Sequence, residues 1–519
     1  MSAPHPSLPR PGAFALLAVL LTALGVLSTD VFRMEGLIAN GASNMGGAQG
    51  YSVAHIYGEV YAYKPPLAYW LAKLSFAAFG AESGLALRAP FALCALALAA
   101  MVVVLLSCAG FARAGRWAGF ATVSGFLLGS KLGMATFDVP LAAGLGLATT
   151  AATVNLYKQR PSAGLWCLAY AGLAFAFLTK GPIAFALFAP GLLFAVLRAG
   201  LVRTLFSAAH LMGVGLCLAL CGAWMLCAWR AMGDSAFQQS TTEASLRLFD
   251  YRWASLLRQP LRPLQTLAFF LPWSLLLLRA PGLRSSADAD AQTRLGRIAW
   301  PFLLGPCTFL FVIATFEPRY YLPLAAPIGV LAGLAIDRGL ERGRPLPTPL
   351  ARGWKILLGV LALALIGGAV QNRVPIGGWN RAALALTAVG AAALLYQNRR
   401  SAQDAATTAK LVGTLAVMLA TVQLAYLRPQ KAWTRSGRSL AQEIAPHLPE
   451  GAEVWTDTHD AWSSLFFYLG HPVRSFAPTA VPPEQGWIVI EGKAAPAWPH
   501  TAVAEFEHHG KHFRLLRTP

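Results

Sequence analysis

Charged residues are scarce in this chain of 519 residues, where Asp, Glu, Lys and Arg make up only 13% of the sequence. A soluble protein carries about a quarter, so the composition excludes an ordinary soluble domain. Hydrophobic residues reach 56%, and the mean hydropathy is +0.52. Apolar runs of roughly 20 residues, the length that crosses a bilayer, recur along most of the chain. The sequence therefore predicts a polytopic α-helical membrane protein, because lipid offers no partners to open backbone groups.

Acidic residues are the rarer charges, and the net charge is +19. In a soluble protein such a charge would suggest a nucleic acid partner. Here the Lys and Arg residues lie in short loops between apolar segments rather than on one basic face. This is the distribution that cytoplasmic loops of membrane proteins show, so we exclude nucleic acid as a partner.

The seven cysteines all lie inside apolar segments, and none has the spacing of a metal site. No disulfide framework is indicated in the polar C-terminal part. The sequence also contains no phosphate-binding loop, no H-E-x-x-H and no G-x-S-x-G motif. If the chain is an enzyme, its substrate must arrive already activated, and the apolar composition points to delivery through the membrane.

The apolar pattern predicts about thirteen membrane spans, including an uncleaved first span near the N-terminus. An odd number places the two termini on opposite sides. If the N-terminus is cytoplasmic, nearly all of the loops on the cytoplasmic side are basic. The positive-inside rule therefore favours a cytoplasmic N-terminus. The predicted spans are 12–29, 86–110, 116–133, 138–157, 163–179, 182–198, 204–228, 263–280, 298–315, 320–337, 353–371, 378–396 and 409–426.

Three segments on the outer side are too long for simple turns, and long loops are often functional. Residues 30–85 contain two stretches that predict short helices on the membrane surface, "VFRMEGLIANGASNM" and "PPLAYWLAKLSFAAFG". The second long loop is 229–262. The tail predicts a helix over 437–447 and short strands in "AEVWTD" and "GWIVIEG". We therefore expect a transmembrane domain over 1–434 and a small α/β domain outside the membrane over 435–519.

Ionisable residues at span ends on the outer face are candidates for function. Each also has a plainer interpretation from its local sequence. Glu35 fits a solvated helix charge, and Asp138 in "FDVPL" fits a helix cap. Lys64 and Lys180 fit cations that extend to the membrane interface. If the two lysines and Arg319 faced one cavity, they would suit a phosphate.

The second outer loop adds Glu243 and Arg247, which are four residues apart and fit a pair along one helix face. Arg319 and Tyr320 stand in "FEPRYYLP" at the outer end of a predicted span. Local sequence alone does not decide between these interpretations and a binding site.

Several motifs in a fixed order resemble the bacterial GT-C fold glycosyltransferases, which include the lipid A aminoarabinose transferase and relatives of protein mannosyltransferases. "RMEG" and "IYGEVYAYKPPLAYWL" resemble the first outer loop of that family. "DVPL", "LTKGP", a "PW" pair and "RYYLP" follow in the family's order. The resemblance covers about residues 12–340, and the tail with "FFYLGHPV" is similar to the outer domain of many members.

The resemblance implies transfer of a sugar from a polyprenyl-phosphate donor to lipid A, another glycan or a protein at the periplasmic face of a bacterial inner membrane. It implies that Glu35 and Asp138 are catalytic. The substrate- and phosphate-binding residues it indicates are Lys64, Tyr69, Lys180, Arg247, Arg319 and Tyr320. In place of Arg247, the arginine of the second loop could be Arg252 or Arg258.

One departure from the family concerns the first loop, where many relatives have an Asp-Glu pair and this chain has Met34-Glu35. The change leaves Glu35 as the expected acid or base. It also counts against a bound divalent metal, and the sequence assigns no cofactor.

Two other classes of protein remain as alternatives. A transporter or flippase for polyprenyl-linked sugars could use the same charges, but it should show internal repeats and broken helices near mid-membrane. The sequence shows no repeat, and its candidate charges gather at one face. A non-catalytic receptor or assembly factor of the cell envelope would tolerate the loss of Glu35 and Asp138.

Overall fold

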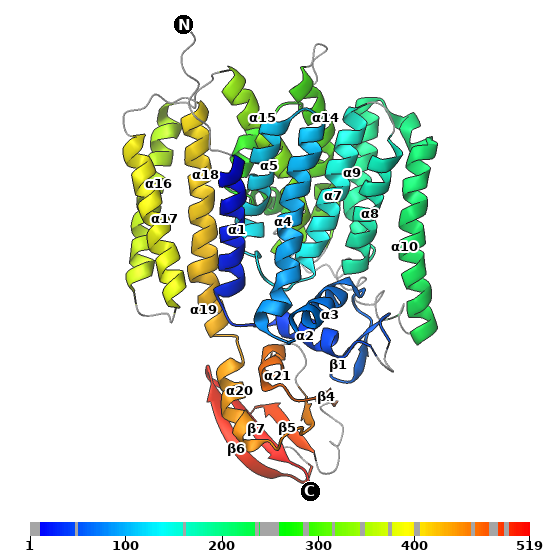
Figure 1. Ribbon diagram of the computed structural model, residues 1–519, viewed down its shortest axis with the longest axis vertical. Helices are drawn as coiled ribbons and strands as arrows, with labels where there is room; N and C mark the ends of the chain where they lie inside the picture. The colour runs from blue at the N-terminus through cyan, green and yellow to red at the C-terminus, as the bar shows by residue number, and fades with distance from the viewer. Residues whose placement is uncertain are drawn as a thin grey trace.

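The fold was obtained as a computed structural model. It describes the chain except for residues 1–10, 47–49, 159–161, 234–237, 239–258, 284–289, 314–316, 343–347, 372–375, 399–404, 458–461, 477–485 and 493–497. Figure 1 shows a bundle of long helices with a small mixed domain at one end. Helix α1 (Pro11–Leu27) begins at the other end of the bundle, away from that domain.

Each predicted span overlaps helix, although 116–133 and 263–280 are interrupted, the second between α13 (Arg262–Phe269) and η4 (Trp273–Arg279). In the described part of the chain, nine helices are long and apolar enough to cross a membrane, or ten if the bent pair α13–η4 is one span. The prediction of about thirteen is larger because α1, α5 and α9 have only 17, 13 and 17 residues. The chain is a multi-pass membrane protein. The helices of the first half are α4 (Gly84–Cys108), α5 (Ala112–Ser124), α6 (Phe126–Gly129), α7 (Asp138–Tyr157), α8 (Ala163–Lys180), α9 (Ile183–Ala199), η2 (Val202–Phe206) and α10 (Ala208–Met232).

The second half of the bundle includes a sharp break, because α13 and η4 meet at an angle of 102°. Its helices are η3 (Gln259–Leu261), α13 (Arg262–Phe269), η4 (Trp273–Arg279), α14 (Ala291–Val312), η5 (Pro318–Leu324), α15 (Ala325–Arg342), α16 (Thr348–Val370), α17 (Gly378–Gln397), α18 (Ala405–Val422), the π-helical turn η6 (Gln423–Leu427) and α19 (Arg428–Trp433).

Burial separates the centre of the bundle from its edges. The apolar windows of α7 and of η5–α15 are 94% and 100% buried inside the protein, whereas those of α10, α16 and α17 are 22%, 17% and 22% buried. A helix in lipid can leave apolar side chains on its outer face, so low burial is expected at the rim of a bundle. Helices α16 and α17 pack on α18 at one edge, and α10 lies at the other (Figure 1). The ends of α7 and α15 are therefore central.

One predicted span is wrong in its detail. The pattern predicts a continuous helix over 116–133, but α5 ends at Ser124 and the short α6 ends at Gly129. The chain then makes a turn over 130–137 that presses on the end of α1. A Cβ on Gly133, whose φ is +65°, would lie 2.4 Å from the backbone nitrogen of Val26. Glycine is required there for both conformation and space.

Residues 30–85, which the sequence predicts to be the first outer loop and which keep that name below, contain the two predicted short helices, α2 (Met34–Ser43) and α3 (Leu67–Phe79). A hairpin of β1 (Ala54–Ile56) and β2 (Glu59–Tyr61) joins them. These elements lie across the end of the bundle that faces the C-terminal domain (Figure 1). Helix α3 presents both buried and exposed faces, with Tyr69 and Phe76 inside and Leu74 outside. This is the amphipathic pattern of a surface helix.

The C-terminal part contains α20 (Arg438–Ile444), η7 (Ala445–His447), α21 (Ser463–Leu469) and a five-stranded sheet in the order β4-β3-β5-β7-β6. Strand β3 (Val454–Thr456) pairs in parallel with β4 (Val473–Ser475) and β5 (Trp487–Glu491). Strands β5, β7 (Lys511–Arg517) and β6 (Thr501–His508) are antiparallel neighbours. The predicted helix, the two predicted strands and the mixed α/β class are confirmed.

The first outer loop and the C-terminal part share one apolar core. A single cluster of buried side chains joins Leu37 and Ile38 of α2 to Leu465 and Phe466 of α21. The contact is close, because a Cβ on Gly36 would lie 2.3 Å from the carbonyl oxygen of Ser463. The C-terminal part is therefore packed directly on the loop that carries Glu35.

Candidate active site

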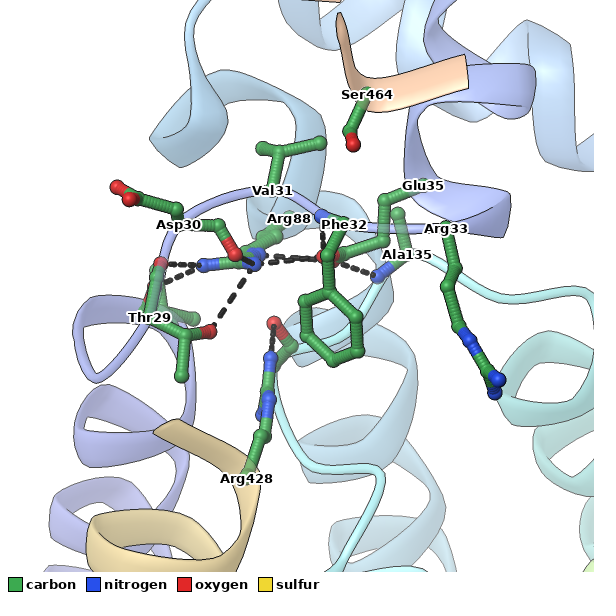
Figure 2. Close-up of polar contacts among 12 residues, drawn as sticks. Thr29, Asp30, Val31, Phe32, Arg33, Glu35, Arg88, Ala135, Arg428 and Ser464 are labelled. Carbon is green, nitrogen blue, oxygen red and sulfur yellow. Dashed lines mark hydrogen bonds and ion pairs between the residues drawn. The ribbon is translucent and has the colours of Figure 1, made fainter. Parts of the chain in front are cut away.

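Glu35 lies at the centre of a buried polar network between α1, α2 and α4 (Figure 2). Its side chain is 0% exposed. Arg88 of α4 donates from Nε to Oε1 at 2.8 Å and from Nη2 to Oε2 at 2.6 Å. The backbone N–H groups of Ala135 and Phe32 donate to the same two oxygens at 3.0 and 3.3 Å. A bidentate pair with two further donors uses most of the accepting capacity of a carboxylate.

The rest of the Arg88 guanidinium holds the end of α1. Its Nη1 donates to the carbonyl oxygens of Val26 and Thr29 at 3.0 and 2.6 Å, and its Nη2 donates to the carbonyl of Asp30 at 2.7 Å. The last carbonyls of a helix have no partner within the helix, so this arginine satisfies them from the next span. We infer that Arg88 and Glu35 together fix the turn between α1 and α2.

The catalytic role of Glu35 stays a prediction, and this geometry argues against it. A general base must reach the proton of the acceptor, and this carboxylate is sealed from solvent and bonded on both oxygens. Burial alone would raise the pKa of Glu35, but the charge and hydrogen bonds of Arg88, with smaller effects of Arg428 and the Ala135 N–H, hold it below its usual 4.5. The assignment that fits is an ionised structural carboxylate.

Stability should therefore depend on the charge of Glu35 at acid pH. A carboxyl whose folded pKa is lowered stabilises the protein above its unfolded pKa and loses that contribution as pH falls through the folded value. We expect the gap in unfolding temperature between the wild type and Glu35→Gln to be largest near neutral pH and to shrink below about pH 4.5. Intrinsic fluorescence melts over a pH series measure it; a constant gap down to about pH 3 would contradict the ionised assignment.

A second buried arginine holds the turn that follows α6. Arg428, at the start of α19, donates from Nη1 to the carbonyl of Leu132 at 2.6 Å and from Nη2 to that of Gly133 at 3.1 Å. Because Ala135 of the same turn donates to Glu35, the two arginines link α1, α2, α4, α19 and the turn into one network. The turn that this network holds ends directly before Asp138 in the sequence.

Asp138 and Lys180 meet where two antiparallel helices reach the end of the bundle that carries the C-terminal domain. Asp138 is the first residue of α7 and Lys180 the last of α8, positions where helix dipoles favour an anion and a cation. Lys180 Nζ donates to Asp138 Oδ1, and the two side chains are 11% and 6% exposed. The plainer interpretation of Asp138, a cap of α7, does not hold, because its carboxylate pairs with the lysine and makes no cap hydrogen bond; its catalytic role stays a prediction.

Tyr320 completes this cluster from η5. Lys180 Nζ lies 4.5 Å from the centre of its ring, and the Arg319 guanidinium lies 5.9 Å from it. Arg319 also lies 3.7 Å from Glu317 at a partly exposed position. A cation over an aromatic face is held by the ring quadrupole, so Tyr320 positions both charges. The structure thus brings together four predicted residues: Asp138, Lys180, Arg319 and Tyr320.

The turn that carries Lys64 lies beside the turn after Lys180. The Cγ of Pro65 is 3.8 Å from the position that a Cβ on Gly181 would take, and Gly181 has φ +77°. Lys64 Nζ donates to the carbonyl of Tyr63 at 3.1 Å in a partly exposed setting. Pro65 and Pro66 restrict this backbone and lead into α3. The double proline therefore holds Lys64 near the Lys180 turn.

Two predicted binding residues have other outcomes. Tyr69 is 0% exposed and packs edge-on against Phe137 at 5.5 Å, so it lies in the core, and its binding role stays a prediction. Arg247 and its neighbours Glu243, Arg252 and Arg258 lie outside the described residues.

Sequence reasoning missed Lys131, which stands in the turn between α6 and α7. Burial and the nearby charges of Arg428, Arg319 and Lys431 lower its pKa, whereas Asp138 raises it. The charges of Lys131 and Asp138 therefore interact, which adds Lys131 to the residues near this cluster. The apolar run over 116–133 concealed it, because a lysine near a span end is usually only an interface residue.

Sequence reasoning also missed Arg33. Its φ of 54° lies in the left-handed region, which is uncommon for a residue other than glycine. Figure 2 shows its side chain pointing away from the Glu35 network, while its carbonyl accepts a hydrogen bond from Ser463 Oγ of α21. Strained residues of this kind persist where the surroundings fix them, often at functional sites.

The C-terminal part contributes two more contacts to the same loop. Val31 N donates to the hydroxyl of Tyr468 at 2.6 Å, and Arg438 pairs with Asp30 at 2.7 Å. The Asp30 and Arg438 side chains are 41% and 53% exposed, so this pair contributes at most about 1 kcal/mol to stability. Its effect is to orient Asp30, which stands at the start of the loop.

The residues around Glu35 do not fit a divalent cation. Such an ion prefers several oxygen ligands, but the Glu35 oxygens are bonded to Arg88 and Met34 adds no oxygen ligand. Across the described residues, no group of three or more His, Cys, Asp or Glu side chains could hold a metal.

The sequence matches known proteins over part of its length. Residues 63–226 match the family described as dolichyl-phosphate-mannose-protein mannosyltransferase. An undecaprenyl-diphosphatase of Anaeromyxobacter sp. (strain K) is 42% identical over 85 residues, which are 15% of this chain and 29% of that protein. A homologue from Anaeromyxobacter dehalogenans is 40% identical over a stretch of the same length. The chain thus matches less than a third of the length of these relatives.

The fold matches known structures over nearly the whole chain. ArnT from Cupriavidus metallidurans bound to undecaprenyl phosphate has a TM-score of 0.74 at 20% identity, with 97% of each chain covered. The apo form of ArnT has a TM-score of 0.72 at 19% identity over the same share. This chain therefore has the GT-C fold of ArnT, and within that fold residues 63–226 match the model of the dolichyl-phosphate-mannose-protein mannosyltransferase family.

Proposed function

We propose that this protein transfers a sugar from a polyprenyl-phosphate donor to an acceptor at the end of the bundle that carries the C-terminal domain. The observation that supports it most is the cluster of Lys180, Asp138, Tyr320 and Arg319, with Lys64 on the adjacent turn. Cations held at one end of an apolar bundle suit a phosphate on a lipid. ArnT, which has this fold, binds undecaprenyl phosphate.

In this proposal the cations hold the donor phosphate and stabilise it as it leaves. The bond between the anomeric carbon and the phosphate oxygen breaks, and an acceptor oxygen forms the new bond to that carbon. Negative charge grows on the departing phosphate, and prearranged cations favour that transition state. Asp138 positions the Lys180 ammonium. A single displacement gives inversion at the anomeric carbon.

The acceptor that this geometry favours is one that is already anionic. Glu35 is sealed, and the cluster carboxylates Asp138 and Glu317 both lie beside cations. A hydroxyl acceptor needs a base to take its proton, whereas a phosphate such as that of lipid A is a nucleophile without one. We therefore propose a phosphate-bearing glycolipid in preference to a protein or a neutral glycan.

The basic ends of the helices support an orientation. Arg113, Arg198, Arg294 and Arg342 lie at the end of the bundle away from the C-terminal domain. Positive loops face the cytoplasm, so we propose that the C-terminal domain lies in the periplasm and that the membrane is the bacterial inner membrane. We also propose that the chain divides into a transmembrane part, 1–434, and a periplasmic domain, 435–519, that share the core described above.

Mass spectrometry of envelope lipids and proteins, from cells with and without this protein, tests the proposal. We expect a glycolipid that gains the mass of one sugar only when the wild-type protein is present, with the addition on a phosphate in fragment spectra. Cells that carry Lys180→Met serve as the matched control. If neither a modified acceptor nor a change in polyprenyl-linked sugar accompanies the protein, the transferase proposal is wrong; a sugar on a hydroxyl would overturn only the acceptor.

A further inference from the structure

A groove of about 1390 Å³ lies among helices of the second half of the bundle. None of the residues proposed above to hold phosphate lines it. Its walls come from α13, η4, α14, α15 and the start of α18, and most of the lining side chains are apolar. The groove follows the helices from Phe311 and Ile328 to Arg342 at the last turn of α15. Its long, apolar shape suits a lipid chain.

One end of the groove is basic. Arg279 of η4 and Arg338 and Arg342 of α15 line it at the end of the bundle opposite the C-terminal domain. Arg338 donates to Thr293 Oγ1 at 2.7 Å, and Arg338 and Arg342 lie 3.2 and 3.0 Å from Asp290. Among the described residues that line this end, three are arginines and none is acidic, and the neighbouring Asp290 offsets one of the three charges.

Arg279 differs from the other two arginines because it is exposed. Among the described residues, no hydrogen bond or ion pair engages its guanidinium. Arg342 is 42% exposed, so its charge is also accessible at the mouth of the groove. A guanidinium offers two parallel donors that match the oxygens of a phosphate.

We propose that this groove binds an anionic glycerophospholipid from the leaflet at this end of the bundle. The phosphate lies on Arg279 and Arg342, and an acyl chain fills the apolar part between η4 and α14. Basic pockets between membrane helices on the positively charged side are suited to such headgroups. The tail of a polyprenyl phosphate fits less well, because its far end is uncharged and would leave the arginines without an anion.

Native mass spectrometry of the full-length protein in mild detergent tests this binding with three probes: phosphatidylglycerol, phosphatidylcholine and a polyprenyl phosphate. We expect phosphatidylglycerol to bind about tenfold more tightly than phosphatidylcholine, because hydrogen bonds to charged groups are the stronger ones. The double variant Arg279→Gln, Arg342→Gln should abolish that preference. Arg203→Gln, an exposed arginine of η2 at the same end but outside the groove, should keep it.

A second variant separates the groove from general surface charge. Leu275 lines the groove and is 45% exposed, so Leu275→Trp should fold normally and obstruct the chain-binding part. We expect this substitution to weaken the binding of both glycerophospholipids while the arginines stay in place. The proposal would be overturned if the wild type bound the two glycerophospholipids equally, or if Arg203→Gln lost the preference for phosphatidylglycerol as fully as the double variant does. It would also be overturned if the arginine double variant lost its binding of polyprenyl phosphate.

Discussion

Arg88→Met should destabilise the protein by about 3–5 kcal/mol, because it leaves Glu35 as an uncompensated charge in a sealed site. The pair is 2% and 0% exposed, so water cannot replace the guanidinium without opening the contact between α2 and α4. The loss should appear as a lower unfolding temperature and as early proteolysis of the first outer loop, which this arginine ties to α1.

The matched control for this result is the double variant Arg88→Met, Glu35→Leu. Replacing both members of a buried ion pair with apolar residues is often close to neutral, so most of the stability should return. Recovery should not be complete, since Arg88 also satisfies the carbonyls of Val26, Thr29 and Asp30. If Arg88→Met unfolds like the wild type, or the double variant is no better than the single one, Glu35 does not have the role that we infer.

Lys180→Met should lower kcat for sugar transfer by about 10²–10³, which is the usual effect of removing one group that stabilises charge in a transition state. The lysine pairs with Asp138 and lies 4.5 Å from the centre of the Tyr320 ring, and both contacts hold its ammonium at the proposed phosphate site. The measurement is the initial rate of transfer by purified protein at saturating donor.

Two controls separate catalysis from folding in this experiment. Lys180→Met leaves Asp138 buried without its partner, so the double variant with Asp138→Asn should recover stability but not activity. Lys158→Ala changes an exposed lysine at the other end of α7 and should leave the rate unchanged. An active Asp138→Asn, Lys180→Met protein would show that the cluster serves only the fold.

The sequence predicted the architecture well because each signal was local. Apolar runs predicted the positions of the helices, and the double proline with an amphipathic stretch predicted the surface helix α3. The break between α5 and α7 was missed because Gly125, Gly129 and Gly133 interrupt an apolar run without making it polar. Only the close approach of the turn to α1 shows why glycine is needed at position 133.

The sequence identified many residues of the site, but it did not predict which side chains pair with one another. Asp138 and Lys180 are 42 residues apart, and only the antiparallel packing of α7 on α8 brings them together. Glu35 was assigned to catalysis because its partner, Arg88, follows 53 residues later in a segment that reads as a plain membrane span. Burial decides the role of such a carboxylate, and burial depends on packing between distant segments.

The contacts of the C-terminal domain could not be read from the sequence for the same reason. Tyr468 and Arg438 reach Val31 and Asp30 across more than four hundred residues of chain. Within the tail, periodicity predicted β3 and β5, but β6 and β7 have charged and histidine-rich sequences that conceal their alternation. Strand β7 pairs with both β5 and β6, so the place of β6 and β7 depends on contacts between strands rather than on local sequence.

The most direct test of the account is a transfer reaction in nanodiscs that contain the purified protein, polyprenyl-linked sugars extracted from the envelope, and a phosphate-bearing glycolipid acceptor. The account predicts that free polyprenyl phosphate and sugar-modified acceptor form in equal amounts with the wild type, and that neither forms with Asp138→Asn, Lys180→Met. Intact donor after incubation with well-folded wild-type protein would contradict it. Donor that crosses a vesicle membrane without cleavage of its sugar–phosphate bond would instead identify a transporter.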